Sequence, residues 1–276
     1  PDCDDAGALA ILLQYINKYH NRLLGIVNCT SNPYANSTIK AICEYYGIDE
    51  ITVAKHTGSA QLENNSKYSK KITKKYCKYE NSAVSAVPAE DFYKEVLSKA
   101  KDDSVTIISI GMLTEISKAL DNDTLLFNNK VNSIVSMAGE YPSGEEFNVS
   151  TDTFAFKNVI EKFRNIIVFS GYETGKDIKT GFETEFENNP VFNCYKLYCE
   201  GDLPYLNSSF DLTAVQYAFE GNNTYYALSK PVNITVDSKG KISTSKNKHS
   251  NRYYLIKQEK SEIIAKELND LLRKEP

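Results

Sequence analysis

The chain has 276 residues, of which 41% are hydrophobic and 25% charged, and its formal net charge is −4. These proportions are typical of a globular protein with a buried core and exclude a disordered chain. The longest apolar stretch, residues 6–13, is too short to cross a bilayer, and the acidic balance excludes a protein-wide basic surface. We therefore expect neither a membrane nor a nucleic acid as a partner.

The predicted elements alternate between helices and strands along most of the chain. Helical periodicity covers residues 6–19, with Asp4 and Asp5 in the N-terminal turn, and then 37–46, 88–101, 113–120 and 153–163. Short apolar runs predict strands at 23–27, 51–54, 104–110, 131–137 and 166–169. Such alternation predicts an α/β fold with an open, mostly parallel sheet and helices on both faces.

The C-terminal part follows a different pattern. Residues 224–236 and 241–256 are typical of an antiparallel pair of strands, and residues 260–272 predict a closing helix. We find no repeat or linker, so we expect residues 1–276 to form a single domain. The six cysteines are too sparse for a disulfide scaffold and lack zinc-site spacing, which favours buried free thiols.

The carboxylates carry the chemistry that the sequence suggests. Asp2, Asp4 and Asp5 lie within four residues before a helix, where like charges repel unless a cation or the helix dipole compensates them. A helix cap is the alternative for this cluster, whereas hard oxygen ligands would suit Ca²⁺ or Mg²⁺. Asp211 precedes the helix expected at 213–219, and there too a plain N-cap is the alternative.

A third polar segment follows the strand at 131–137. In an extended chain, Glu146 and Asn148 would share one face and point into a cleft at the carboxyl ends of the strands. The alternative is an ordinary polar loop, in which Asp152 or Thr151 caps the next helix.

Together these segments resemble the nucleoside hydrolase family, the inosine/uridine-type N-ribohydrolases. Residues 1–9 (PDCDDAGAL) resemble the second half of the family's N-terminal aspartate signature, and residues 110–114 resemble its Gly-Pro-Leu-Thr turn. Residues 146–148 match the Glu-Phe-Asn sugar clamp, and Asp211 aligns with the late aspartate that binds metal and ribose. The resemblance runs in register over residues 1–272.

The resemblance implies a calcium-dependent hydrolase that cleaves the N-glycosidic bond of ribonucleosides by attack of water on ribose C1′. It assigns Ca²⁺ to Asp5, Asp211 and the backbone carbonyl of Thr114. It assigns substrate binding to a polar and aromatic set, namely Asp4, Asn32, Glu140, Glu146, Asn148 and Phe210. The general-base aspartate of the family is expected to lie before Pro1, so the catalytic residue is unknown and we expect the native chain to begin earlier.

Two departures from the family pattern bear on specificity. Phe210 stands where some members place a histidine acid, and an aromatic ring there favours stacking on a purine-like base. Glu140 replaces a frequent asparagine and would repel a 5′-phosphate, which favours nucleosides over nucleotides. The histidines His20, His56 and His249 lie outside the motifs, and we expect them on the surface or at helix ends.

Other function classes stay open at this point. One is a catalytically impaired family member that binds nucleosides or sugars, and another is an Mg²⁺ phosphotransferase of the haloacid-dehalogenase kind. By analogy with the family we expect a homo-oligomer, either a dimer or a tetramer. The cytoplasm is favoured as the compartment, with secretion as the alternative because an earlier N-terminus is expected.

A lysine-rich segment is the remaining feature. Six lysines recur at near-helical spacing among three tyrosines, Tyr68, Tyr76 and Tyr79. A solvated helix face is favoured over contact with nucleic acid or membrane, because the rest of the chain is acidic. The lysines are Lys67, Lys70, Lys71, Lys74, Lys75 and Lys78.

Overall fold

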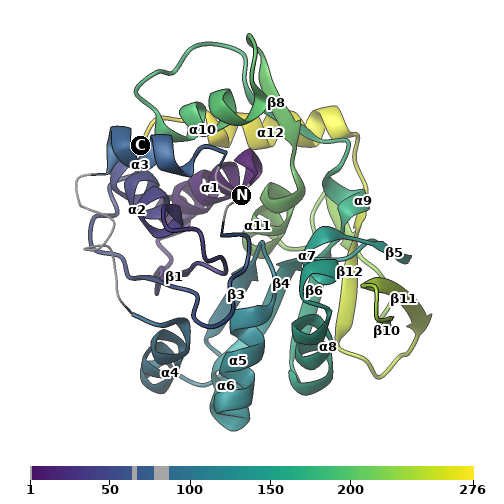
Figure 1. The fold of residues 1–276 in the computed structure, drawn as a ribbon. Helices are drawn as coiled ribbons and strands as arrows, with labels where there is room; N and C mark the ends of the chain where they lie inside the picture. Colours follow the sequence, from purple (N-terminus) through teal and green to yellow (C-terminus); the bar gives the residue numbers. More distant parts are fainter. Residues whose placement is uncertain (1, 64–66, 78–86) are drawn as a thin grey trace. The chain divides into compact units, whose positions relative to one another are not determined.

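The structure is a computed structural model that describes residues 2–63, 67–77 and 87–276 (Figure 1). The chain divides into two compact units. Unit 1 comprises Pro1–Ala89, Ile178–Leu212 and Ser261–Pro276, and unit 2 comprises Glu90–Asp177 and Thr213–Lys260. The single domain expected over residues 1–276 stays a prediction.

Unit 2 is built on a five-stranded sheet with the strand order β3-β4-β6-β12-β9. Strands β3, β4, β6 and β12 run parallel, whereas β9 pairs antiparallel with β12. Strand β4 is an apolar run that is buried over most of its length, as expected for a parallel strand between helix layers. The predicted α/β fold with a mostly parallel sheet is confirmed. The strands are β3 (Val105–Ser109), β4 (Val131–Met137), β6 (Ile166–Ser170), β9 (Tyr226–Leu228) and β12 (Arg252–Lys257).

The helices of unit 2 follow the predicted ones closely. The helices expected at 88–101, 113–120 and 153–163 are present as α4, α5 and α8, with bounds shifted by a few residues. Helices α5 and α8 are joined by Asn158, whose amide nitrogen donates to the hydroxyl of Ser117 at 2.8 Å. The helices are α4 (Ala89–Lys99), α5 (Thr114–Asn122), α6 (Thr124–Lys130), α7 (Phe147–Thr151), α8 (Thr153–Lys162), α9 (Tyr172–Gly175) and α11 (Phe210–Glu220), of which α4 and α11 begin in unit 1.

The two C-terminal segments pair antiparallel, as predicted, but they form two pairs of strands instead of one. The segment 241–256 forms two strands in two sheets: β11 (Lys241–Lys246) pairs with β10 (Val232–Val236) and β5 (Ser143–Glu145), whereas β12 joins the main sheet. The break follows Asn247, whose side-chain oxygen accepts from the backbone N–H of His249 at 3.0 Å and forms a turn. The segment 224–236 also splits into β9 and β10, and Pro231, which has no N–H to donate, lies between them.

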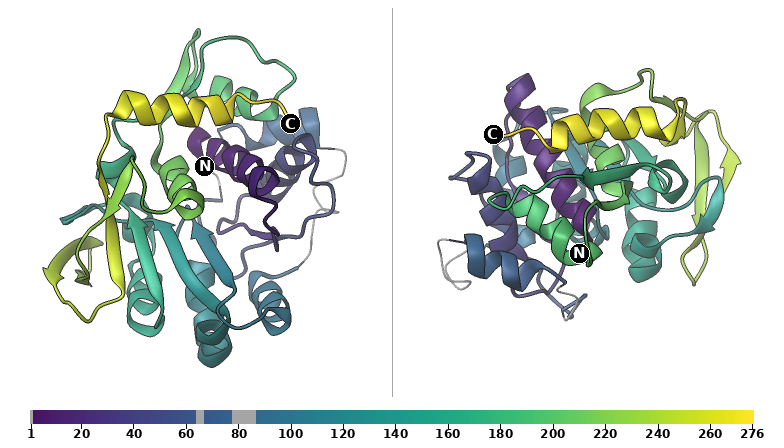
Figure 2. Two further views of the ribbon diagram at one scale, coloured as in Figure 1. Left: turned by 180° about the vertical axis from the view of Figure 1, so that it is seen from behind. Right: turned by 90° about the horizontal axis from the view of Figure 1, so that it is seen from above.

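Unit 1 is mainly helical. Helix α12 runs alongside α1 (Figure 2) and buries Ile264, Leu268 and Leu272, which are four residues apart and so share one face. Gly47, at φ 77°, follows the end of α2, where a glycine can take up the left-handed conformation that ends a helix. The helices are α1 (Cys3–Tyr19), α2 (Ala35–Tyr45), α3 (Ser69–Tyr76), α10 (Pro190–Cys199) and α12 (Ser261–Leu272).

Unit 1 also contains two small sheets. Strands β1 (Ile26–Val27) and β2 (Val53–Ala54) pair in parallel and are shorter than the predicted strands 23–27 and 51–54. Strands β7 (Lys179–Phe182) and β8 (Tyr205–Ser208) form an antiparallel pair that the sequence analysis did not predict.

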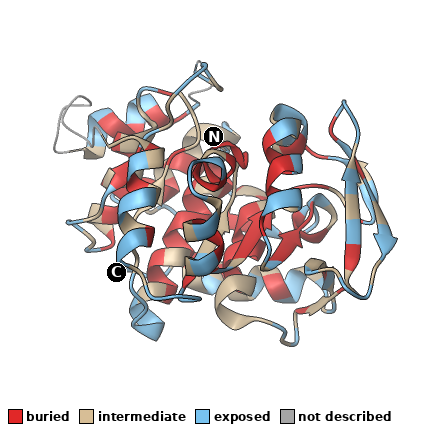
Figure 3. Ribbon diagram, turned by 90° about the horizontal axis from the view of Figure 1, so that it is seen from below, coloured by how far each residue is buried: buried red, intermediate tan, exposed pale blue. Residues whose placement is uncertain are grey.

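Buried residues concentrate on the strands and on one side of most helices (Figure 3). This distribution is the expected result of helices that present an apolar stripe to a sheet or to another helix. Within the described residues, no helix combines the length and the apolar character needed to cross a bilayer.

Candidate active site

The acidic segment of unit 1 is held at the start of α1. The carboxylate of Asp4 is 2% exposed, and its Oδ2 accepts hydrogen bonds from the backbone N–H groups of Phe210 at 3.1 Å and Asp211 at 3.3 Å. Asp4 therefore pairs with backbone N–H groups and with the positive end of the helix dipole at the N-terminus of α11, although it lies 206 residues before Phe210 in the chain. Three residues that the resemblance assigned to the site, Asp4, Phe210 and Asp211, are thus brought together.

This contact also changes the interpretation of Asp211. Helix α11 begins at Phe210, three residues before the predicted start, so Asp211 lies in its first turn. The alternative that Asp211 is a plain N-cap is therefore wrong. Two backbone N–H groups at this helix start, those of Phe210 and Asp211, donate to Asp4.

The carboxylates of Asp2, Asp4 and Asp5 lie close together at the start of α1 and repel one another. Asp5 Oδ2 accepts from the backbone N–H of Asp2 at 2.7 Å, in the manner of a capping box. Burial raises the pKa of Asp5 to about 6. Burial, followed by the charges of Asp5 and Asp2, raises the pKa of Asp4 well above its usual range. A bound cation would relieve this cost.

Two further residues of unit 1 bear on the site. Asn32, predicted to bind ribose, is buried, and its Oδ1 accepts from the N–H of Tyr34 at 2.9 Å just before α2. Tyr68 is a residue that the sequence analysis assigned to the basic cluster. Its buried hydroxyl donates to the carbonyl of Asp2 at 2.9 Å and so supports the acidic segment. The sequence feature that could have predicted this burial is an aromatic ring within a run of lysines, since the ring favours the interior and the lysines favour the solvent.

In unit 2, Glu146 and Asn148 lie at the carboxyl ends of the parallel strands. Glu146 caps α7, and its two oxygens accept from the backbone N–H groups of Gly139 (2.9 Å), Asn148 (2.7 Å) and Val149 (3.2 Å). Asn148 Nδ2 donates to the carbonyl of Met137, at the end of β4, at 3.0 Å. The predicted extended conformation is wrong here, because residues 147–151 form a helical turn.

Thr114 and Asp152 form a second contact in unit 2. Asp152 caps α8 by accepting from the N–H of Ala155 at 2.9 Å, which confirms its predicted cap role. Its other oxygen accepts from the hydroxyl of Thr114 at 2.5 Å. The first residue of α5 is thereby tied to the start of α8.

Glu140, predicted to bind substrate, lies half-buried in the loop between β4 and β5. Its side chain packs so closely on Gly144 that a Cβ atom there would overlap it. Burial raises the pKa of Glu146, and its backbone hydrogen bonds oppose that effect. Two carboxylates therefore hold this loop. Glu146 accepts hydrogen bonds from backbone N–H groups, and Glu140 packs against Gly144.

The acidic residues of unit 1 suit a hard cation by the kind of donor they offer. Their carboxylate oxygens suit Ca²⁺ and not zinc. A cation would also offset the repulsion that Asp5 and Asp2 exert on Asp4. Over residues 2–63, 67–77 and 87–276, however, no group of three or more His, Cys, Asp or Glu side chains is gathered around one point. The donors of unit 1 thus fit a hard cation in kind and charge, and the described side chains do not form a complete metal site by themselves.

The remaining predicted features are the histidines and the cysteines. His20 is the exposed C-cap of α1, His249 is exposed, and His56 is half-buried with its ring 2.9 Å from the carbonyl of Ser59. All six cysteines are free thiols, as predicted, and Cys3, Cys43 and Cys194 are buried.

The lysine-rich segment forms helix α3. Two of its lysines make contacts within unit 1: the Lys67 ammonium lies 4.1 Å from the ring centroid of Tyr198, and Lys75 donates to the carbonyl of Glu187 at 3.0 Å. These intramolecular contacts support a structural role for this face. Lys78 and Tyr79 lie outside the described residues.

Comparison with known proteins places these observations in a family. Residues 1–269 match the family model described as inosine-uridine preferring nucleoside hydrolase. A search of curated protein sequences found no match.

The fold is similar to that of several solved structures. A plant nucleoside hydrolase, the PpNRh1 enzyme, is 15% identical with a TM-score of 0.77, over 99% of this chain and 96% of that one. An inosine-guanosine nucleoside hydrolase is 15% identical with a TM-score of 0.76, over 99% and 95%. The purine-preferring ribonucleoside hydrolase from Gardnerella vaginalis is 16% identical with a TM-score of 0.70, over 99% and 96%. At these identities, the likeness establishes a shared fold.

Proposed function

We propose that this chain, which belongs to the inosine-uridine preferring nucleoside hydrolase family, hydrolyses the N-glycosidic bond of ribonucleosides by attack of water on ribose C1′. The observation that carries the proposal is the contact of Asp4 with the start of α11. It unites the first and the last acidic segments of the chain, the two that the resemblance assigns to metal and ribose.

The chemistry requires negative groups around the sugar, because cleavage of the bond builds positive charge on the ribose ring. Asp4 is fixed by two backbone donors and keeps its carboxylate in place without further rearrangement. We assign to Asp4 and Asn32 the binding of ribose hydroxyls from unit 1.

Glu146 and Asn148 take the same role from unit 2. The amide nitrogen of Asn148 is committed to the carbonyl of Met137, so its oxygen Oδ1 is the atom offered to a sugar hydroxyl. Glu146 is oriented by three backbone N–H groups and holds its charge near the ends of the strands. Side chains that are fixed in this way bind the transition state with little loss of entropy.

We assign Ca²⁺ to Asp5, Asp211 and the carbonyl of Thr114. When bound, it would supply positive charge for the sugar hydroxyls and for the attacking water, whose pKa it lowers. The raised pKa values of Asp4 and Asp5 support a cation at this place, since two buried carboxylates repel each other without one.

Phe210 and Glu140 are the proposed determinants of specificity. The ring of Phe210 would stack on the base and favour a purine-like leaving group, and Glu140 would repel a 5′-phosphate. The inosine-guanosine and purine-preferring names of two similar structures support the purine assignment. We further propose that the chain acts as a homo-oligomer, a dimer or a tetramer.

The test is ribose release from purine and pyrimidine nucleosides, measured with calcium and with a chelator. We expect release that the chelator abolishes, faster with inosine or guanosine than with uridine. Asp211→Asn should abolish most of it, whereas Asp270→Asn, an exposed site in an ion pair with Lys266 on α12, should not. Nucleoside binding without release by the unmodified protein would contradict hydrolysis and favour a nucleoside-binding protein.

A further inference from the structure

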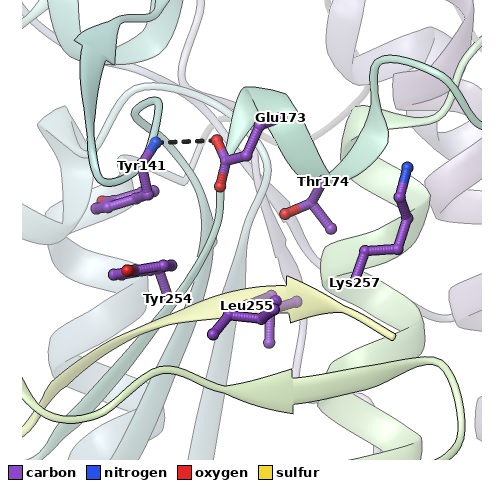
Figure 4. A pocket seen from close by; sticks show the side chains of 7 residues that line it. Tyr141, Glu173, Thr174, Tyr254, Leu255 and Lys257 are labelled. Carbon is purple, nitrogen blue, oxygen red and sulfur yellow. Dashed lines mark hydrogen bonds between the residues drawn. The ribbon is translucent and has the colours of Figure 1, made fainter. Parts of the chain in front are cut away.

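A pocket in unit 2 has no role in the proposed reaction (Figure 4). It lies between the loop after β4, helix α9 and the C-terminal end of β12, and its volume is about 210 Å³. One water molecule needs only about 10–15 Å³ of such space, so the pocket has room for a small organic molecule. Its lining residues are Tyr141, Glu173, Thr174, Tyr254, Leu255, Ile256 and Lys257.

Most of the wall is apolar and rigid. The rings of Tyr141 and Tyr254 are stacked, with centroids 5.0 Å apart and planes 10° apart, and Tyr141 also stacks on Phe169. Strand β12 supplies Leu255 (Figure 4) and, next to it, Ile256 as the aliphatic part of the wall. Because Tyr141 stacks on a ring at each face, it would change little when a ligand enters.

Three polar atoms of the wall residues are buried without a hydrogen-bond partner in the described part of the chain. Glu173 Oε2 accepts from the backbone N–H of Tyr141 at 2.9 Å, but its other oxygen, Oε1, has no partner. The hydroxyl of Thr174, a residue only 1% exposed, has none, and neither has the hydroxyl of Tyr141. Buried polar groups of folded proteins are almost always satisfied, so the neighbouring pair Glu173 and Thr174 indicates a partner that comes from outside the chain.

The charge of the wall determines the kind of partner. Burial raises the pKa of Glu173 and the nearby carboxylate of Glu140 raises it further, whereas backbone hydrogen bonds and the charge of Lys176 lower it. Lys257, a cationic residue of the lining, lies on the far side of Thr174 from Glu173 (Figure 4). A positively charged hydrogen-bond donor would therefore be favoured beside Glu173. A calcium ion is disfavoured, because it takes six to eight oxygen ligands and this wall is mostly aromatic and aliphatic.

We propose that this pocket binds a small molecule with a protonated amine, amidine or guanidine head, which donates to Glu173 Oε1 and Thr174 Oγ1 while its apolar body packs against Tyr254, Leu255 and Ile256. Gly171 helps to build the site, because a Cβ atom there would lie 2.6 Å from Glu173 Oε1. This binding site is additional to the proposed nucleoside site and does not depend on it.

The test uses three cations and three neutral molecules of matched shape: isobutylamine with isobutanol, benzylamine with benzyl alcohol, and methylguanidine with methylurea. Binding is measured by titration calorimetry on the whole protein. We expect at least one cation to bind about tenfold or more tightly than its neutral counterpart, since hydrogen bonds to a charged partner are about twice as strong as neutral ones.

Variants locate the binding. Glu173→Gln, which keeps the shape of the side chain, should weaken cation binding roughly ten- to hundredfold, and Thr174→Val should weaken it less. Glu161→Gln, an exposed site on α8 in the same unit, should leave it unchanged. Circular dichroism and the melting temperature show whether each variant is folded.

Equal affinity for the cations and their neutral counterparts, or cation binding that a folded Glu173→Gln variant retains, would overturn the proposal. Lack of binding by all six compounds would do so as well and would identify water as the occupant. Ribose release should persist in Glu173→Gln, so a failure here is distinguishable from a failure of the proposed hydrolysis.

Discussion

Two buried carboxylates, Asp4 in unit 1 and Glu146 in unit 2, carry their charge in different ways. Both lie less than a tenth exposed, and both accept hydrogen bonds from backbone N–H groups at the start of a helix. Glu146 has three such donors, all within seven residues of it. Asp4 has two, from a distant segment, and it faces the charges of Asp5 and Asp2.

The difference indicates what each of the two carboxylates needs. The charge of Glu146 is compensated by backbone dipoles that belong to its own loop, so this loop is organised before any ligand binds. The acidic segment of unit 1 retains repulsion that the backbone does not remove. We therefore expect the acidic segment of unit 1, and not the loop of Glu146, to be stabilised by calcium.

The largest expected effect is the loss of activity in Asp5→Asn. If Asp5 binds the metal, the variant should lower kcat/KM for nucleosides by about 100-fold or more, as the removal of one charge-stabilising group typically does. Steady-state kinetics of ribose release measures this, with Asp270→Asn as the control. Wild-type kinetics in Asp5→Asn would remove the basis for placing the cation in unit 1.

Glu146→Gln tests whether the backbone N–H groups around Glu146 compensate its charge. Glutamine cannot replace both carboxylate oxygens as acceptors, so we expect a loss of about 1–3 kcal/mol in the free energy of unfolding. Urea denaturation with and without calcium measures it, and the loss should be the same in both. Glu161→Gln should stay within about 0.5 kcal/mol of the parent. A loss that calcium reverses would show that the two carboxylates do not differ as described.

The stability of the calcium-free protein should fall as the pH rises. The folded pKa of Asp5 is raised to about 6 from an ordinary value of 3.8, so the folded state binds the proton more tightly than the unfolded one. Its contribution is complete below about pH 4 and is lost as the pH passes 6, a change of roughly 1–3 kcal/mol.

Melting temperatures between pH 4 and 7, with chelator and with calcium, measure this dependence. Calcium binds the ionised carboxylates, so its stabilising effect should grow over the same range. Asp5→Asn should flatten the chelator curve. A stability that rises with pH in the chelator would refute the raised pKa.

The smallest expected effect is at the hydrogen bond between Thr114 and Asp152. Thr114→Val keeps the shape of the side chain and removes the donor, which should cost about 1 kcal/mol of unfolding free energy. Asp152→Asn should cost a similar amount, because it also weakens the cap of α8. A double-mutant cycle measures the coupling, and additive losses would mean that the two side chains do not interact in solution.

The sequence predicted local elements well wherever one periodicity held without interruption. Strand β4 has the predicted bounds, 131–137, where the β-branched residues Val131, Ile134 and Val135 favour a strand. At 224–236 and 241–256 the predicted antiparallel pairing is confirmed, but each segment forms two strands that belong to different sheets. Alternation continues through the short turn between two such strands, so the pattern does not show where one strand ends and the next begins.

Among the residues of the candidate site, too, the features that depend on local contacts could be predicted and those that depend on distant contacts could not. Asp152 could be recognised as a helix cap, because a cap hydrogen bond spans only three residues. The conformation of Glu146 and Asn148 was predicted as extended and is helical, because Glu146 caps the turn that contains Asn148. The inward position of Tyr68 depends on Asp2, which lies 66 residues earlier in the chain.

By itself, the sequence determined the α/β fold class, the order of most helices and strands, and the family, because these depend on periodicity and on motifs that are read along the chain. Only the tertiary structure decided where α11 begins and that Asp4 compensates it. The physical reason is that an unsatisfied N–H group at a helix start can donate to any suitable oxygen that folding brings near. A partner 206 residues away leaves no trace in the local sequence.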